Sequence, residues 1–300
     1  MTFILVLATA LGYAQEEEDF VASDIFASVS EGDKAALLMV HFGTTHDDTR
    51  ALTIDMINRK AAEAFSGIEV REAWSSRIVM RRIKARGVEK LNPSEALDRL
   101  HEDGFTHIII QSTNVIDGAE MESLRKDVES KAAAFKEVRI GTPLLYKPED
   151  YEAVVEAITQ NGLTDGANVL VGHGTYNPAT AQYAMMDYML KAKGYTNFFV
   201  GTIEGYPSFD TMLIQLKASG LKRVQLMPFM FVAGDHANND IAVDWKEALE
   251  SEGFEVTVFM EGLGQNAAIQ DLYISHARHA ASHRAVDLTA KKKAYATADD

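Results

Sequence analysis

Three polar residues follow three buried, strand-like runs in the second half of the chain. His173 stands between two glycines at the end of one run, Glu204 follows the run 198–203, and His236 follows the run 224–231. The separations of 31 and 32 residues match one strand-helix unit each. Parallel strands end at the same edge of a sheet, so we expect the three side chains to face one cleft.

Two imidazoles and one carboxylate form a ligand set that suits Co, Ni, Fe or Zn. Three protein ligands also leave coordination positions open for a substrate. The neighbouring glycines would allow close backbone approach to such a site; they are Gly172, Gly174, Gly205 and Gly234. We therefore predict that His173, Glu204 and His236 are catalytic and metal-binding. The alternative for each histidine is an ordinary surface or hydrogen-bonded role on a loop.

Other chemistries find less support in the sequence. The chain has no cysteine, which excludes disulfides and thiolate catalysis. The segment 172–175 has neither the serine of a nucleophile elbow nor the pattern of a phosphate-binding loop. For His41 and His46, on the corresponding loop of the first half, we expect capping or surface roles. The basic segment 77–86 is interpreted as a solvated helix face, although Arg77 could meet carboxylates of an anionic ligand.

Composition indicates a globular protein that does not bind nucleic acid. The chain has 300 residues, of which 47% are hydrophobic, enough for a large core. Its formal net charge of -15 gives no dominant basic face for phosphates.

The first 14 residues are apolar and uncharged, and an acidic stretch follows them directly. They are too few to span a bilayer and end in a small-x-small pattern, so residues 1–14 are interpreted as a cleaved signal peptide. Residues 15–34 are then an acidic lead-in. We expect a periplasmic protein with no stable membrane anchor after cleavage; the alternative is a frayed N-terminal helix in a cytoplasmic protein.

Strand and helix patterns alternate along the chain and then repeat. The predicted strands begin near Ala35, Ile68, His107, Val138, Val169, Phe198, Val224 and Phe254. Residues 39–44 also match residues 170–175, which pairs Phe42 with His173. Such alternation predicts an α/β protein with two similar lobes, each a parallel sheet flanked by helices, around a cleft. We assign the lobes to residues 35–162 and 163–280, and a flexible tail to residues 281–300.

Several motifs together resemble one enzyme family. In the second lobe these are Val171-Gly-His-Gly-Thr175, Gly201-Thr-Ile-Glu-Gly-Tyr-Pro207 and the segment from Met227 to Asp240. In the first they are Val40-His-Phe-Gly-Thr-Thr45, Ala73-Trp-Ser-Ser-Arg-Ile78 and Gly118-Ala-Glu120. The combination is similar to the anaerobic sirohydrochlorin cobaltochelatases of cobalamin biosynthesis, from Ala35 to His279.

That resemblance implies the class II chelatase fold and insertion of Co²⁺ into the tetrapyrrole sirohydrochlorin, without a nucleotide cofactor. By the same resemblance, His173 and His236 correspond to the family's metal-site histidines, and Glu204 corresponds to its acidic partner. Arg77, Gly174 and Gly205 are expected to contact the tetrapyrrole, and the protein is expected to be a homo-oligomer. The chain departs from the family pattern at His41, where a small or apolar residue is more usual.

Three alternatives stay open. The same ligand set would suit an iron or nickel chelatase acting on a related tetrapyrrole. A periplasmic carrier that binds a tetrapyrrole or a metal without catalysis is the second. The third concerns haem: His101 could ligate it at a subunit contact, but nothing in the surrounding sequence supports this.

Overall fold

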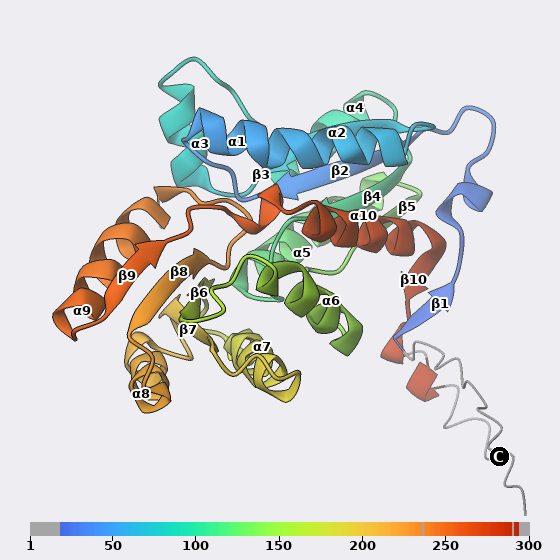
Figure 1. Ribbon diagram of the computed structural model, residues 1–300. Helices are drawn as coiled ribbons and strands as arrows, with labels where there is room; N and C mark the ends of the chain where they lie inside the picture. Colours follow the sequence, from blue (N-terminus) through green and yellow to red (C-terminus); the bar gives the residue numbers. More distant parts are fainter. Residues whose placement is uncertain (1–18, 236, 290, 294–300) are drawn as a thin grey trace, which may run out of the picture.

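Two four-stranded parallel sheets share one strand order in the computed structural model, which describes residues 19–235, 237–289 and 291–293 (Figure 1). The first sheet has the order β3-β2-β4-β5 and the second β7-β6-β8-β9. The identical order follows the internal repeat and confirms the two-lobed α/β fold. The strands are β2 (Ala35–His41), β3 (Glu69–Trp74), β4 (His107–Ser112), β5 (Glu137–Ile140), β6 (Ala167–Gly174), β7 (Phe198–Glu204), β8 (Arg223–Pro228) and β9 (Glu255–Val258).

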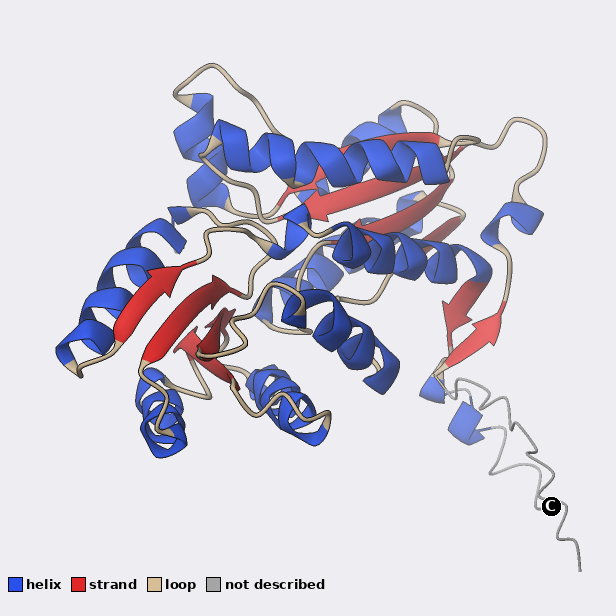
Figure 2. Ribbon diagram, viewed as in Figure 1, coloured by secondary structure: helices blue, strands red, loops and turns tan. Residues whose placement is uncertain are grey.

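Helices connect and cover these strands (Figure 2). The α-helices are α1 (Asp47–Leu52), α2 (Ile54–Ala64), α3 (Arg77–Lys84), α4 (Pro93–Glu102), α5 (Ala119–Lys131), α6 (Pro148–Thr159), α7 (Ala181–Ala192), α8 (Phe209–Ser219), α9 (Lys246–Ser251) and α10 (Ala267–Ser282). A π-helix, Ala237–Trp245, leads directly into α9. Short 3-10 turns cover Ile25–Ser28, Ala132–Ala134, Pro178–Thr180 and Leu263–Gln265.

Each sheet is buried on both faces, so its central strands are almost continuously apolar. In β6, Val169 and Val171 pack with α8, the π-helix and α9, whereas Leu170 belongs to the core on the opposite face. In β2, Leu38 packs towards α4 and α5, and Leu37 towards α2. This alternation is what two-sided burial of parallel strands requires.

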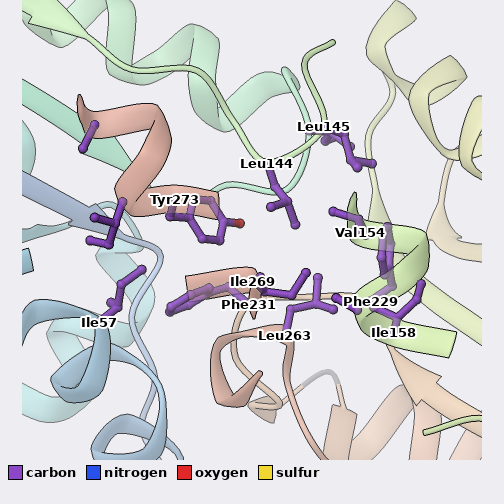
Figure 3. Close-up of a cluster of buried hydrophobic side chains, with 14 of the residues drawn as sticks. Ile57, Leu144, Leu145, Val154, Ile158, Phe229, Phe231, Leu263, Ile269 and Tyr273 are labelled. Carbon is purple, nitrogen blue, oxygen red and sulfur yellow. The ribbon is translucent and has the colours of Figure 1, made fainter. Parts of the chain in front are cut away.

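The two lobes share one hydrophobic core. The close-up in Figure 3 shows Ile57 of α2 and Tyr273 of α10 in the same cluster as Val154 of α6 and Phe229, which follows β8. Core packing between lobes, in addition to contacts around the cleft, fixes their relative position.

The two ends of the described chain pair with each other. Strand β1 (Phe20–Ala22) runs antiparallel to β10 (His283–Ala285), with Val21 opposite Arg284. Helix α10 lies in the range that we assigned to the second lobe, yet it packs against β4 and α2 of the first (Figure 1). Strand β10 likewise lies within the predicted tail, so the structure differs from that expectation at this point.

The predicted signal peptide, residues 1–14, lies outside the described residues. Of the predicted lead-in, residues 19–34 are described, and they include β1 and the first 3-10 turn. Among the helices that the structure describes, none has the length and apolar character needed to traverse a bilayer.

Candidate active site

A cavity of about 720 Å³ lies where the carboxyl ends of both sheets meet. The first lobe contributes the loops after β2 and β4, the start of α5 and one face of α3. The second contributes the ends of β6 and β7, the loops after β6 and β8, and residues of α7 and the π-helix. The cavity lining includes Thr44, Thr45, Arg82, Thr113, Glu120, His173, Gly174, Tyr183, Glu204, Phe229, Phe231, Asp235 and Asp240.

His173 and Glu204 both line this cavity. Strands β6 and β7 pair in parallel with Gly174 opposite Glu204, so His173 lies one residue before the position that faces Glu204, near the ends of adjacent strands. The imidazole of His173 is partly buried, with Nδ1 3.3 Å from the carbonyl oxygen of Gly174, and Glu204 is exposed. The structure thus brings these two residues to one cavity.

His236, the third predicted ligand, lies outside the described residues. Asp235, immediately before it, lines the cavity, and Ala237, immediately after it, begins the π-helix. Within the described part of the chain, no group of three or more histidines and carboxylates could hold a metal ion. The three-residue metal site therefore stays a prediction.

The predicted glycines permit tight packing of the strand ends. Gly174 has a φ of 87°, and a Cβ there would lie 1.5 Å from the backbone oxygen of Glu204. Gly205 has a φ of 96°, and its Cβ would lie 2.4 Å from the backbone oxygen of Thr175. Only glycine can combine a positive φ with such a close approach of a neighbouring backbone without strain. Gly174 lines the cavity; Gly205, although described, is outside the lining, so its predicted contact with the tetrapyrrole stays a prediction.

The basic helix α3 meets the cavity through a different arginine from the predicted one. Arg77 is exposed at the first position of α3 and is not among the described lining residues, whereas Arg82, five positions later, is. Arg82 forms an ion pair with Asp235. The sequence pattern placed the basic segment beside the cleft but could not choose the arginine, because the choice depends on how α3 rotates against its sheet.

Carboxylates and a phenol also line the cavity. Glu120, Asp235 and Asp240 line the cavity, and the Ser75 hydroxyl donates a hydrogen bond to Glu120 at 3.0 Å. Burial raises the pKa of Tyr183 to about 12, although a hydrogen bond from the backbone N–H of Gly174, 3.3 Å away, opposes this rise. Tyr183 therefore stays protonated at neutral pH.

His41 and His46 form hydrogen bonds with neighbouring side chains. His41 is buried at the end of β2, with Nδ1 3.1 Å from Thr113 Oγ1 and Nε2 2.9 Å from Asn58 Oδ1. His46 precedes the first residue of α1 and binds Asp235. His41 and His46 thus each contact a residue of the cavity lining, Thr113 and Asp235 respectively.

His101 lies away from the cavity lining. It is exposed in the last turn of α4, edge-on to the ring of Phe135. The haem possibility at His101 gains no support from these surroundings.

The cavity combines an apolar wall with polar side chains at the strand ends. Phe229, Met230, Phe231 and Val232 form an apolar wall behind the strand ends. An imidazole at the cavity surface can bind a transition metal. Carboxylates nearby compensate the charge of a divalent ion.

Comparisons with known proteins point to one family. The cobalt chelatase (CbiK) family matches residues 35–282. The chain is 34% identical over 262 residues to the sirohydrochlorin cobaltochelatase of Salmonella typhimurium, covering 85% of this chain and 98% of that protein. It is 29% identical over 259 residues to the sirohydrochlorin cobaltochelatase CbiKC of Nitratidesulfovibrio vulgaris, covering 83% and 91%.

The fold agrees with a solved chelatase. SirB from Bacillus subtilis, determined with Fe³⁺, superimposes with a TM-score of 0.59 at 13% sequence identity, covering 83% of this chain and 96% of that one. At this identity the likeness concerns the fold alone. From the family match over the whole two-lobed body and the 34% identity to a relative covered almost completely, we conclude that this chain belongs to the cobalt chelatase (CbiK) family.

Proposed function

We propose that this protein inserts Co²⁺ into sirohydrochlorin, with His173, Glu204 and His236 as the residues that hold the metal. The observation that carries the proposal is the convergence of His173 and Glu204 on one cavity at the strand ends of a cobalt chelatase fold. The named activity of the two relatives supports the choice of metal and macrocycle.

Insertion requires the loss of two pyrrole N–H protons and the transfer of a partly desolvated ion to the macrocycle. In our proposal His173 and His236 present Co²⁺ to one face of the ring, and one of them accepts a pyrrole proton after it releases the metal. Glu204 compensates the ion's charge and, being exposed, passes protons to solvent. The apolar wall at Phe229 and Phe231 supports the other part of the ring. Arg77, Gly174 and Gly205 remain proposed contacts of the tetrapyrrole.

The first test follows the absorption change of metal-free sirohydrochlorin when Co²⁺ and purified protein are added under anaerobic conditions. Wild type should convert the macrocycle catalytically. His173→Ala and His236→Ala should slow insertion by about 100-fold or more, since removal of a ligand should cost at least as much as loss of an outer-shell partner. His101→Ala is the matched control and should keep the wild-type rate, because His101 lies outside the cavity lining.

Each alternative gives a distinct result in this assay. Faster turnover with Fe²⁺ or Ni²⁺ than with Co²⁺ would reassign the metal. Stoichiometric binding without spectral conversion of the free macrocycle would make the protein a carrier. Near wild-type rates in both histidine variants would overturn the proposed site.

We also propose a periplasmic location and a homo-oligomeric state. The apolar residues 1–14 and the acidic residues behind them support the first. The resemblance to the cobaltochelatases supports the second. N-terminal sequencing of exported protein should begin at Gln15, and light scattering of the purified protein should give a mass above that of one chain. An intact Met1 or a monomeric mass would contradict the respective proposal.

A further inference from the structure

Phe231 is a cavity residue whose ring is enclosed by both lobes. It follows β8 in the second lobe, lines the cavity and is 7% exposed. The imidazole of His41, at the end of β2 in the first lobe, stacks on this ring at 6.1 Å between ring centroids, with an interplanar angle of 20°. The ring of Tyr273 on α10 meets it edge-on at 5.5 Å and 84° (Figure 3). We call His41, Phe231 and Tyr273 the aromatic clamp.

The two outer rings of the aromatic clamp are both held by Thr113, which also lines the cavity. The Thr113 hydroxyl lies 3.1 Å from His41 Nδ1, and the Thr113 carbonyl oxygen accepts from the Tyr273 hydroxyl at 2.9 Å. The other ring nitrogen of His41 lies 2.9 Å from Asn58 Oδ1. Because His41 and Tyr273 are buried, either ring would leave a buried polar group without its partner if it turned away.

The backbone closes a third side of Phe231. The N–H of Gly264 donates to the carbonyl oxygen of Phe231 at 2.8 Å, and a Cβ at Gly264 would lie 2.8 Å from Phe231 Cζ. The Phe231 ring therefore rests directly against the 3-10 turn that precedes α10. Enclosed on these three sides, the ring is held in one orientation at the cavity wall.

Overall stability explains the aromatic clamp poorly. An imidazole in a core must give up the hydration of both nitrogens, which an apolar side chain of similar volume avoids. Buried polar groups whose hydrogen bonds are all made instead rigidify a core and specify one arrangement. His41 is such a group, and two of the residues that it contacts, Thr113 and Phe231, line the cavity from the first and the second lobe. The arrangement that His41 fixes is therefore that of the cavity wall.

We propose that His41 and Tyr273 are positioning residues, which hold the Phe231 ring as a rigid wall for the tetrapyrrole. A flat macrocycle packs best on an aromatic ring whose orientation is already fixed, since binding then costs no rotamer freedom of that side chain. The inference rests on the proposed function for the identity of the ligand. It assigns the aromatic clamp to macrocycle binding and not to the metal.

The test measures the binding of metal-free sirohydrochlorin to the purified full-length protein from the change in its fluorescence, without metal, and then kcat and both KM values during cobalt insertion. Phe231→Leu keeps an apolar side chain and removes the flat ring. His41→Leu removes the stacked ring and its hydrogen bonds. We expect each variant to raise Kd and KM for the macrocycle by about 5- to 10-fold, the worth of one aromatic contact. The KM for Co²⁺ and kcat should stay within about 2-fold of wild type, because the lost contact belongs to macrocycle binding alone.

A double-mutant cycle separates positioning from an independent role of His41. If His41 acts through the Phe231 ring, His41→Leu should have no further effect on macrocycle binding in the Phe231→Leu background. Losses that add in full would overturn the inference, as would wild-type macrocycle affinity in Phe231→Leu or an equal rise in KM for Co²⁺. Tyr273→Phe keeps the ring and should bind the macrocycle more tightly than Tyr273→Leu; the reverse order would overturn the role of Tyr273.

A matched control separates positioning from general destabilisation. His107 begins β4 at the opposite end of the first sheet, is 2% exposed and is not among the described cavity residues. His107→Leu should leave macrocycle binding unchanged, and a loss equal to that of His41→Leu would overturn the inference. Urea unfolding checks that each variant is folded under the assay conditions.

The same measurements distinguish this inference from the proposed function. If wild type binds the macrocycle but inserts no cobalt, the proposed function fails, whereas the binding constants still decide the role of the aromatic clamp. If wild type does not bind the macrocycle, both fail.

Discussion

His41 ends the central strand of the first sheet and begins a buried chain of polar contacts. Asn58 Nδ2 donates to Glu72 at 2.8 Å, so its Oδ1 is left to accept from His41 Nε2; Nδ1 then accepts from the Thr113 hydroxyl. Lys90 completes the chain through its ion pair with Glu72. Because Thr113 lines the cavity, this series of polar contacts runs from the cavity wall to Glu72 on β3.

Burial lowers the pKa of His41, although the charge of Glu72 opposes the effect. The native state therefore binds fewer protons than the unfolded state below the unfolded pKa of about 6.5. Stability is fully present above that pH and falls as the pH drops towards the lower native pKa.

We expect His41→Gln to lose less stability on acidification than wild type. Its free energy of unfolding should fall less between pH 6.5 and pH 5 than that of wild type, because the titrating group is gone. Urea unfolding at pH 8 and pH 5 measures this difference. His101→Gln, at an exposed position, serves as control and should follow wild type; an equal loss in His41→Gln would contradict the assignment.

At the scale of elements, the paired ends of β6 and β7 hold the candidate ligands. At Gly174 this pairing leaves no room for a side chain, since a Cβ there would lie 1.5 Å from the backbone oxygen of Glu204. Gly194, after α7, has a similar φ of 90°, but a Cβ at that position would have no described atom within 4 Å. The two glycines thus share a backbone requirement and differ only in packing.

Gly194→Ala should cost about 1 kcal/mol of stability, because a residue with a Cβ is strained in a left-handed backbone, and should leave cobalt insertion unchanged. Gly174→Ala carries the same strain and also pushes β6 from β7, so we expect it to cost about 3 kcal/mol or more. Displacement of His173 relative to Glu204 should slow insertion by about 100-fold. Denaturant unfolding and insertion assays on both variants check this. Similar behaviour of the two variants would show that the close approach is unimportant.

The π-helix is the second element that shapes the site. Its buried residues Ala237, Ile241 and Trp245 recur every four positions, and Trp245 packs edge-on against Phe209 at 4.9 Å between ring centroids. Burial of this face anchors the segment that follows residue 236. π-Helical turns are rare and are frequently found at functional sites, which agrees with the place of this one beside the cavity.

For the whole molecule, a buried arginine ties both ends of the described chain to the first sheet. Arg139 on β5 is 7% exposed, and its Nη1 donates to the carbonyl oxygens of Ala281 at 2.9 Å and Ala280 at 3.2 Å at the end of α10. It also binds Ser23 near β1 and pairs with Glu137 at 2.7 Å. Helix α10 in turn donates from the Tyr273 hydroxyl to the carbonyl of Thr113 at 2.9 Å.

Arg139→Met should lower the free energy of unfolding by about 3 kcal/mol, because several buried carbonyls and the Glu137 carboxylate lose their partner. Arg223→Met, at a side chain that is 47% exposed, should change it by about 0.5 kcal/mol or less. The midpoints of urea unfolding compare the two. Equal midpoints for Arg139→Met and wild type would contradict the assigned role of Arg139.

Much of the fold could be predicted because local patterns carry it. Strands β2 and β4 begin where predicted, at Ala35 and His107, since each contains an apolar run that a sheet position covered on both faces buries. The repeat of residues 39–44 at 170–175 predicted two lobes of one topology. The placement of His173 and Glu204 at one edge followed from strand order alone. The π-helix could not be predicted, because apolar residues four apart are equally typical of an α-helix.

Only the tertiary structure decided the contacts between distant segments. The hydrogen bond between His46 and Asp235 joins residues 189 positions apart, and such pairing leaves no periodic signal in a sequence. The sequence likewise contained no sign that Arg82 rather than Arg77 lines the cavity, that α10 packs against the first lobe or that β1 pairs with β10. By itself the sequence determined which residues end the strands, because burial dictates its apolar runs; which of them meet across the cleft depended on how the two sheets pack.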